Sequence, residues 1–384
     1  MRQVPRAAVL AATVAGLVAA AWLTINIAGA YDGDYSGLFY TGAESTLPSE
    51  LEAHTRRVDD PAGYDAQFYH LLAHDPLMRR GFAEHIDNLS LRWRRIGVPA
   101  LAWMLAAGND EYIDYMYVAI QLAFVLLGTY WLARYAELQG RHAAWGLTFL
   151  LVPAVLVSLD RMTIDLPLAA LCVAFTLYAT SPNRAALYAV LIVAPLVRET
   201  GIILTAGWFV HAALRRYRRA MILSAATAGP TIAWWGYVRS QTWADGTDWY
   251  ASYPLSGIVE RTFVGSGIPP LSAWLQTAAA LEEVANAGMW LAFALAGYLA
   301  WKRSLGLLEL TAILFALFDS MLGRLDIWTS AYAAGRTMSP LLLLLALLAL
   351  RGRSWVFAAP LLLMLPRITL QYQAQLKAAL QGLL

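Results

Sequence analysis

Residues 63–70 have the sequence Gly63-Tyr64-Asp65-Ala66-Gln67-Phe68-Tyr69-His70, which sets one carboxylate among aromatic and amide side chains. Together with the residues up to Pro76, this stretch predicts a short helix. It lies within the longest polar segment of a chain that is otherwise largely apolar. We therefore expect the chemistry of the protein at Asp65, close to a membrane surface.

The composition around this stretch is that of a membrane protein. Hydrophobic residues make up 59% and charged residues 14% of the 384 residues, whereas soluble domains have about 45–50% and about 25%. The fold class expected is all-α, because helices satisfy their own backbone hydrogen bonds in lipid. The net charge of +2 does not indicate a nucleic acid partner, and the single cysteine, Cys172, excludes an intrachain disulfide.

Apolar runs predict about eleven transmembrane helices. The first run, 7–28, exceeds the apolar core of about 7–15 residues in a signal peptide, so we expect a retained helix with its N-terminus inside. Several runs fall short of a ~30 Å hydrocarbon core, which suggests a thinned site or a cavity. The predicted spans are 7–28, 115–133, 142–158, 163–180, 185–197, 200–214, 220–238, 286–301, 305–323, 337–350 and 354–370.

Polar segments between these spans define the expected topology. Residues 31–96 form a large first outer loop, residues 239–285 a second one, and residues 367–384 an amphipathic tail on the outer surface. The run 98–107 is too short to cross and is expected in the interface. Arginines such as those in 215–219 fall in loops assigned to the inside, as the positive-inside rule requires. We expect a multi-pass protein of an inner or plasma membrane with an extracytoplasmic site.

Charged residues next to apolar runs are candidates for function. Arg198 and Glu199 interrupt the run 185–213, and Arg336 precedes the run that starts at Met338. A charge deep in a span costs about 2.5–3.5 kcal/mol, so it is usually paired or functional. Arg198 and Glu199 are either a salt-bridged pair in an outer turn or part of a phosphate site. Arg92, Arg94 and Arg95 at the end of the first loop are either headgroup anchors or sugar-phosphate ligands.

Two further patterns could bind a metal ion. Asp32-Gly33-Asp34 could hold a divalent cation such as Mg²⁺ or Mn²⁺ through carboxylate oxygens, or it could form an ordinary turn. His70 and His74 share one helical face, but only Asp75 stands nearby in sequence as a third ligand, which favours interfacial packing over a metal site. Two groups are interpreted as solvated turns: Asp160, Arg161 and Asp165, and Asp319, Arg324 and Asp326. The aromatics of the second loop are interpreted as interfacial belt residues: Trp243, Trp249, Tyr250, Tyr253 and Trp274.

Residues 63–99 resemble a motif of the GT-C superfamily of integral-membrane glycosyltransferases. Asp65-Ala66-Gln67-Phe68-Tyr69 with Leu71-Leu72-Ala73 is similar to the Trp/Tyr-Asp-Gly-Gln-aromatic-Tyr and Ile-Ala signature of mannosyltransferase-like bacterial members and of the GPI-anchor second mannosyltransferase. Ala66 replaces the usual glycine. The single long loop after the first helix also fits that layout.

The resemblance implies an inverting transfer of a sugar from a polyprenyl-phosphate donor to a glycan, lipid or protein acceptor. Asp65 would be the general base, with Asp34 assisting, because GT-C enzymes often carry an Asp-x-Asp-like motif after the first helix. The alternative for Asp65 is a cap of the helix that begins at Ala66. Arginine suits the donor phosphate because its planar fork binds two oxygens. The expected phosphate ligands are Arg95, Arg198 and Arg336, and the expected substrate contacts are Asp32, Gln67, Tyr69, His70 and Glu199.

The second hypothesis is a transporter or flippase of a lipid-linked saccharide. Many such folds contain internal repeats, and the long acidic loop near the N-terminus has no counterpart later in the chain. A membrane O-acyltransferase would need a histidine within a span, and the predicted topology places none there. A non-enzymatic scaffold would not need Arg198 and Glu199 near the membrane.

Overall fold

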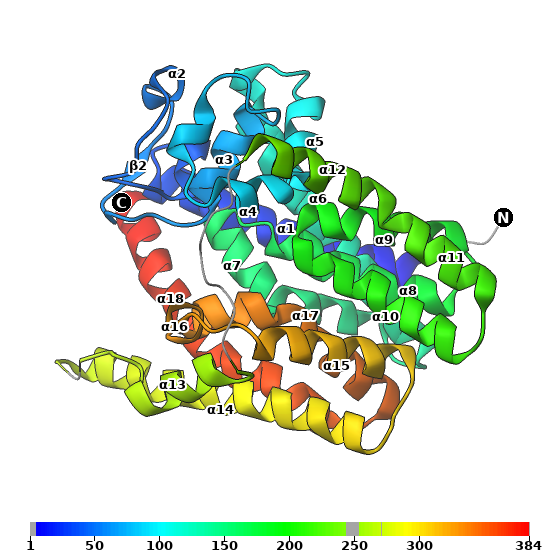
Figure 1. The fold of residues 1–384 in the computed structure, drawn as a ribbon. Coiled ribbons are helices and arrows are strands. Elements are labelled where there is room, and N and C mark those ends of the chain that lie inside the picture. Colours follow the sequence, from blue (N-terminus) through cyan, green and yellow to red (C-terminus); the bar gives the residue numbers. More distant parts are fainter. Residues whose placement is uncertain (1–4, 243–252, 270, 384) are drawn as a thin grey trace.

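Helices account for 77% of the computed structural model (Figure 1). The structure describes residues 5–242, 253–269 and 271–383. Within them, the only strands are β1 (Thr41–Gly42) and β2 (Arg57–Val58), which pair in parallel inside the first loop. The predicted all-α class is confirmed at this level.

Five helices of the described chain are long and apolar enough to cross a membrane, and a bent pair adds at most a sixth span. They are α1 (Arg6–Ala30), α6 (Asp110–Leu138), α14 (Ala273–Trp301), α17 (Ala331–Gly352) and the segment formed by η5 (Trp355–Ala358) and α18 (Ala359–Leu383). The bent pair is η3 (Ala143–Leu151) with α7 (Pro153–Arg161), which meet at 58°. Several long apolar helices are typical of a membrane protein.

The predicted number of eleven spans is not confirmed. Most of the remaining apolar runs form helices of 10–16 residues, too short for a ~30 Å core at 1.5 Å per residue. The run 220–238 forms two helices instead of one span, because the chain breaks at Ala228. These shorter elements are α8 (Asp165–Thr180), α9 (Arg184–Val197), η4 (Glu199–Gly201), α10 (Ile202–Leu214), α11 (Arg218–Thr227), α12 (Gly229–Gln241) and α15 (Leu307–Ser320).

The first loop folds as a cluster of short helices at one end of the bundle, where α2, α3, α4 and β2 lie together (Figure 1). The predicted short helix is confirmed as α3 (Ala66–His74). The run at 98–107 forms α5 (Gly97–Leu105), which is short as expected. The other elements are η1 (Tyr35–Phe39), α2 (Ser49–Glu52), η2 (Phe82–His85) and α4 (Leu89–Arg94).

The second loop is shorter than predicted because helices enter it from both sides. Helix α12 extends to Gln241, α13 (Ser256–Val264) lies within the loop, and α14 begins at Ala273. Tyr253 and Trp274 are exposed, whereas Trp243, Trp249 and Tyr250 lie outside the described residues. The predicted tail is not a separate helix, because α18 runs unbroken through it.

Helices α8 and α17 form the centre of the bundle. Every residue of α8 from Asp165 to Leu177 is buried, and α17 is mostly buried as well. A helix that is apolar around most of its circumference must be covered on all sides. Each nevertheless carries a charge near its N-terminus, Asp165 on α8 and Arg336 on α17. The fold therefore brings these charges together at the end of the bundle that the first loop covers.

Candidate active site

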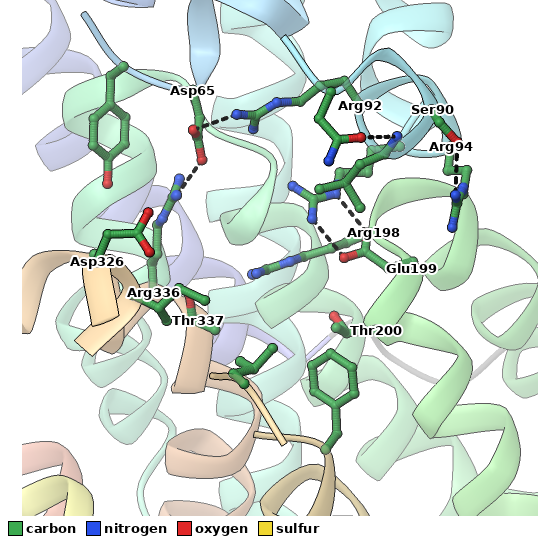
Figure 2. A pocket seen from close by; sticks show the side chains of 18 of the residues that line it. Asp65, Ser90, Arg92, Arg94, Arg198, Glu199, Thr200, Asp326, Arg336 and Thr337 are labelled. Carbon is green, nitrogen blue, oxygen red and sulfur yellow. Dashed lines mark hydrogen bonds and ion pairs between the residues drawn. The ribbon is translucent and has the colours of Figure 1, made fainter. Parts of the chain in front are cut away.

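A cavity of about 400 Å³ lies where the first loop meets the ends of the bundle helices (Figure 2). We call it the arginine cavity, because six arginines and only three carboxylates line it. The carboxylates are Asp65, Glu199 and Asp326. This excess of guanidinium groups makes the cavity suited to an anionic ligand. The arginines are Arg92, Arg94, Arg95, Arg198, Arg239 and Arg336.

A tight turn positions Asp65 at the cavity. Gly63 has φ +66°, and a Cβ there would overlap the backbone of Gly42 in β1, so only glycine fits this crossing. The chain then enters α3 with Asp65 as the residue before its first helical residue. The Asp65 side chain makes no capping hydrogen bond, so the alternative that it merely caps α3 is excluded.

Asp65 instead accepts hydrogen bonds from two arginines on different elements (Figure 2). Its Oδ1 lies 2.9 Å from Nη2 of Arg92 on α4, and its Oδ2 bonds Nη2 of Arg336 on α17. Burial alone would raise the pKa of the Asp65 carboxyl, but the guanidiniums of Arg336 and Arg92 outweigh it and hold that pKa well below its usual range. The carboxylate is therefore ionised at neutral pH while 24% of its side chain stays exposed.

Arg336 and Arg198 are linked through a second carboxylate, Asp165. Arg198 follows α9 and pairs with Oδ1 of Asp165, while Nη1 of Arg336 lies 3.7 Å from its Oδ2. Asp165 is only 4% exposed, so its interpretation as a solvated turn residue is wrong. These charged groups can lie partly inside the bundle because the two guanidiniums pair with the Asp165 carboxylate.

Arg95 is held by a third carboxylate, Glu199. Its Nε and Nη2 each lie 2.7 Å from one oxygen of Glu199, a bidentate pair between α4 and η4. Its Nη1 donates to the Tyr69 hydroxyl at 2.7 Å. Glu199 therefore pairs with Arg95, and the predicted local pair between Arg198 and Glu199 does not form. The Arg95–Glu199 contact joins the first loop to the bundle across 104 residues of sequence.

Removing one partner of this buried pair is expected to destabilise the protein strongly. Arg95→Gln or Glu199→Gln should each lower the free energy of unfolding by about 3–5 kcal/mol, because the remaining charge stays buried without its partner. The loss of unfolding free energy in the double variant should be about 0.5–3 kcal/mol smaller than the sum of the losses in the two single variants. Equilibrium unfolding in detergent measures this, with Glu52→Gln at the exposed Arg57 pair as a control that costs about 0–1 kcal/mol. Single variants as stable as the Glu52→Gln control would contradict the assignment of Arg95 and Glu199 as a buried ion pair.

One wall of the arginine cavity is apolar. Phe318 and Leu322 come from the end of α15 and the segment after it, Ile327 from α16 (Leu325–Trp328), and Ala333 from α17. Cationic and apolar walls thus face the same space. This combination suits a ligand that carries an anionic group next to hydrocarbon.

Three residues predicted at the site lie elsewhere. Asp34 caps η1, where its Oδ1 accepts a hydrogen bond from the Ser36 amide at 2.8 Å. Asp32 is exposed and pairs with Arg56 at 2.8 Å. The two carboxylates therefore have separate local partners, as in the turn alternative. Gln67 binds Gly42, Ser45 and the carbonyl of Ala62, so it holds the first loop together and does not face the cavity.

Tyr69 and His70 are buried behind the site. The Tyr69 hydroxyl accepts from Arg95 and, at 3.4 Å, from Arg92, so it orients these arginines. His70 is 1% exposed and stacks on Phe39 with ring centroids 4.4 Å apart. Neither residue lines the arginine cavity, so substrate contact by Tyr69 and His70 stays a prediction.

The direct contact of Arg92 with Asp65 was not predicted from the sequence. Arg92 was predicted as either a headgroup anchor or a sugar-phosphate ligand, but its guanidinium binds Asp65, whereas Nη2 of Arg94 donates to the Ser90 hydroxyl at 2.9 Å. Asp160 and Asp319 are also buried and not solvated. The apolar residues Leu91, Trp93 and Ile96 among these arginines were a signal that α4 packs against the bundle.

We compared the chain with protein-family models, with curated proteins and with solved structures, and none of the three comparisons finds a match.

Proposed function

We propose that the protein is an inverting glycosyltransferase of GT-C type, which moves a sugar from a polyprenyl-phosphate donor to an acceptor at the extracytoplasmic face of an inner or plasma membrane. The observation that carries the proposal is the Asp65 carboxylate, paired with Arg92 and Arg336, in a cavity lined by six arginines. The resemblance of residues 63–99 to the GT-C motif supports the same chemistry.

The cationic side of the arginine cavity would hold the donor phosphate. Nε of Arg198 and Nε of Arg336 have no hydrogen-bond partner among the described residues. A buried donor without a partner costs about 1–3 kcal/mol, which a bound anion would recover. The apolar wall at Phe318 and Leu322 would accommodate the first units of the polyprenyl chain.

The transfer would require one base and one stabilised leaving group. The acceptor hydroxyl oxygen forms a bond to the anomeric carbon while the bond from that carbon to the phosphate oxygen breaks. Asp65 takes the hydroxyl proton, and the electron pair of the broken bond stays on the polyprenyl phosphate. Arg198 and Arg336 stabilise the charge that develops on this leaving group. Attack from the face opposite the phosphate inverts the anomeric configuration.

Donor binding would also activate the base. With its pKa held well below the usual range, Asp65 is a weak proton acceptor while Arg92 and Arg336 bind it. A phosphate that draws Arg336 away would remove one of the two hydrogen bonds and raise the proton affinity of the carboxylate. The base would then be competent only when the donor is in place.

The proposal is tested by incubating the purified protein with a panel of polyprenyl-phosphate sugars and candidate acceptors, and by measuring the polyprenyl phosphate released. Wild-type protein should turn over at least one donor, and Asp59→Asn, which changes an exposed carboxylate of the same loop, should match it. A flippase would move the intact lipid-linked sugar across vesicles without cleaving it. Translocation without cleavage for every donor would refute the transferase and support the transporter.

A further inference from the structure

Two histidines and one aspartate converge between α3 and α6, outside the arginine cavity. His70 and His74 lie one helical turn apart on α3, and Asp114 lies in the first turns of α6. One ligand atom from each of the three residues lies within 4.8 Å of the other two. Nε2 of His70 is 2.9 Å and Nε2 of His74 is 3.3 Å from Oδ1 of Asp114. Atoms bound to one zinc ion at about 2.0–2.2 Å stand roughly 3–4 Å apart, so the two contacts to Asp114 fit this spacing and the widest separation in the group would have to shorten on binding.

The His70 imidazole pairs with Asp114 and stacks on Phe39, but its pairing with Asp114 lacks the alignment of a hydrogen bond. It is 1% exposed, and within the described chain neither of its ring nitrogens has a hydrogen-bond partner, although Oδ1 of Asp114 is only 2.9 Å away. The N–H direction therefore does not point at that oxygen. A nitrogen and an oxygen that are close but not aligned are expected when both lone pairs point at a third atom between them.

His74 has the outer partner that metal-binding histidines usually have. Its Nδ1 lies 2.8 Å from Oδ1 of Asp110, which also accepts from Nη1 of Arg80 at 2.9 Å. Nε2 of His74 is in hydrogen-bonding geometry with Oδ1 of Asp114 at 3.3 Å. Donation from Nδ1 to Asp110 would free the Nε2 lone pair for a metal ion shared with that oxygen. A carboxylate–histidine arrangement of this kind fixes the tautomer and orientation of a metal ligand.

We propose that His70, His74 and Asp114 bind one divalent transition-metal ion, with zinc as the best fit. Two imidazoles and one carboxylate are a ligand set that zinc takes, with water in the fourth position. The ion would clamp the C-terminal half of α3 to the start of α6. The inference does not depend on the proposed transferase activity, because the ligands lie outside the arginine cavity.

The test measures metal binding by the full-length protein in detergent. Protein treated with a chelator and dialysed is titrated with Zn²⁺, and bound zinc is counted by mass spectrometry. We expect about one ion per chain and, with Co²⁺ instead, the visible absorption bands of a four-coordinate site. Asp114→Asn and His74→Gln should lose the bound ion, and Asp110→Asn should weaken binding about 10–100-fold.

The matched control is His54→Gln, which removes an exposed histidine of the same loop and should bind like wild type. The opposing account is that a charged His74 imidazolium bridges Asp110 and Asp114 with no metal. Failure of the wild-type protein to take up Zn²⁺, or a Co²⁺ spectrum without four-coordinate bands, would overturn the proposal. So would uptake that Asp114→Asn leaves unchanged, since the ion would then sit elsewhere.

Discussion

Asp65→Asn is expected to abolish sugar transfer while donor binding stays intact or becomes tighter. The amide keeps the size of the side chain but cannot take a proton, and a general base contributes about 10²–10⁴-fold to rate. The substitution also removes the anion that competes with the donor phosphate for Arg92 and Arg336. Turnover should therefore fall while donor affinity is kept or increases.

Measuring turnover and donor affinity together distinguishes loss of the general base from loss of the folded structure. Turnover is measured as polyprenyl phosphate released under single-turnover conditions, and donor affinity as displacement of a fluorescent polyprenyl phosphate. An unfolded variant would lose both quantities. Turnover within a few-fold of wild type would remove Asp65 from the mechanism, whatever the affinity.

The second large effect is expected at Arg336. Arg336→Lys keeps the charge but loses the fork that binds two oxygens, so the affinity for donor should fall. A hydrogen bond to a charged group contributes about 1.5–3 kcal/mol, which corresponds to roughly 10–100-fold weaker donor binding. We expect the same loss for the product polyprenyl phosphate, because both carry the phosphate.

A matched variant controls for this change. Arg219→Lys alters an exposed arginine on α11, away from the arginine cavity, and should leave donor affinity at the wild-type value. If Arg336→Lys lowered the rate of sugar transfer but left the affinity for donor and product unchanged, the assignment of Arg336 to the phosphate would be contradicted.

The sequence was informative where local physics decides the outcome. Apolar composition predicted helices, and the polar stretch around Asp65 predicted α3, because patterning of apolar residues over a few turns is a local property. It also identified Arg95, Arg198, Arg336 and Glu199 as unusual, because charges at the ends of apolar runs need partners. All four line the same cavity as Asp65.

The partners of these charges could not be predicted, because they are set by tertiary packing. Asp65 and Arg336 are 271 residues apart, and nothing local indicates that they meet. In the sequence, Asp165 at the start of α8 looks like a solvated turn residue. In the fold it is buried and contacts Arg198 after α9 and Arg336 on α17. In contrast, the Asp32-Gly33-Asp34 pattern suggested a cation site, but local turn chemistry and Arg56 satisfy its carboxylates.

The predicted number of eleven spans is not confirmed for a related reason. Hydropathy identifies apolar runs but does not indicate where a helix within such a run ends, as at Val152–Pro153 and Ala228. The proposed metal site also could not be predicted without the fold, because its proposed third ligand is Asp114 on α6 and not the neighbouring Asp75.

The most direct test of the central claim is a structure of the protein in lipid nanodiscs with bound polyprenyl phosphate, determined by cryo-electron microscopy. We expect the phosphate in the arginine cavity within hydrogen-bonding distance of Arg198 and Arg336, with the contact between Arg336 and Asp65 opened. A phosphate bound outside the cavity, with Asp65 still paired to both Arg92 and Arg336, would contradict the account.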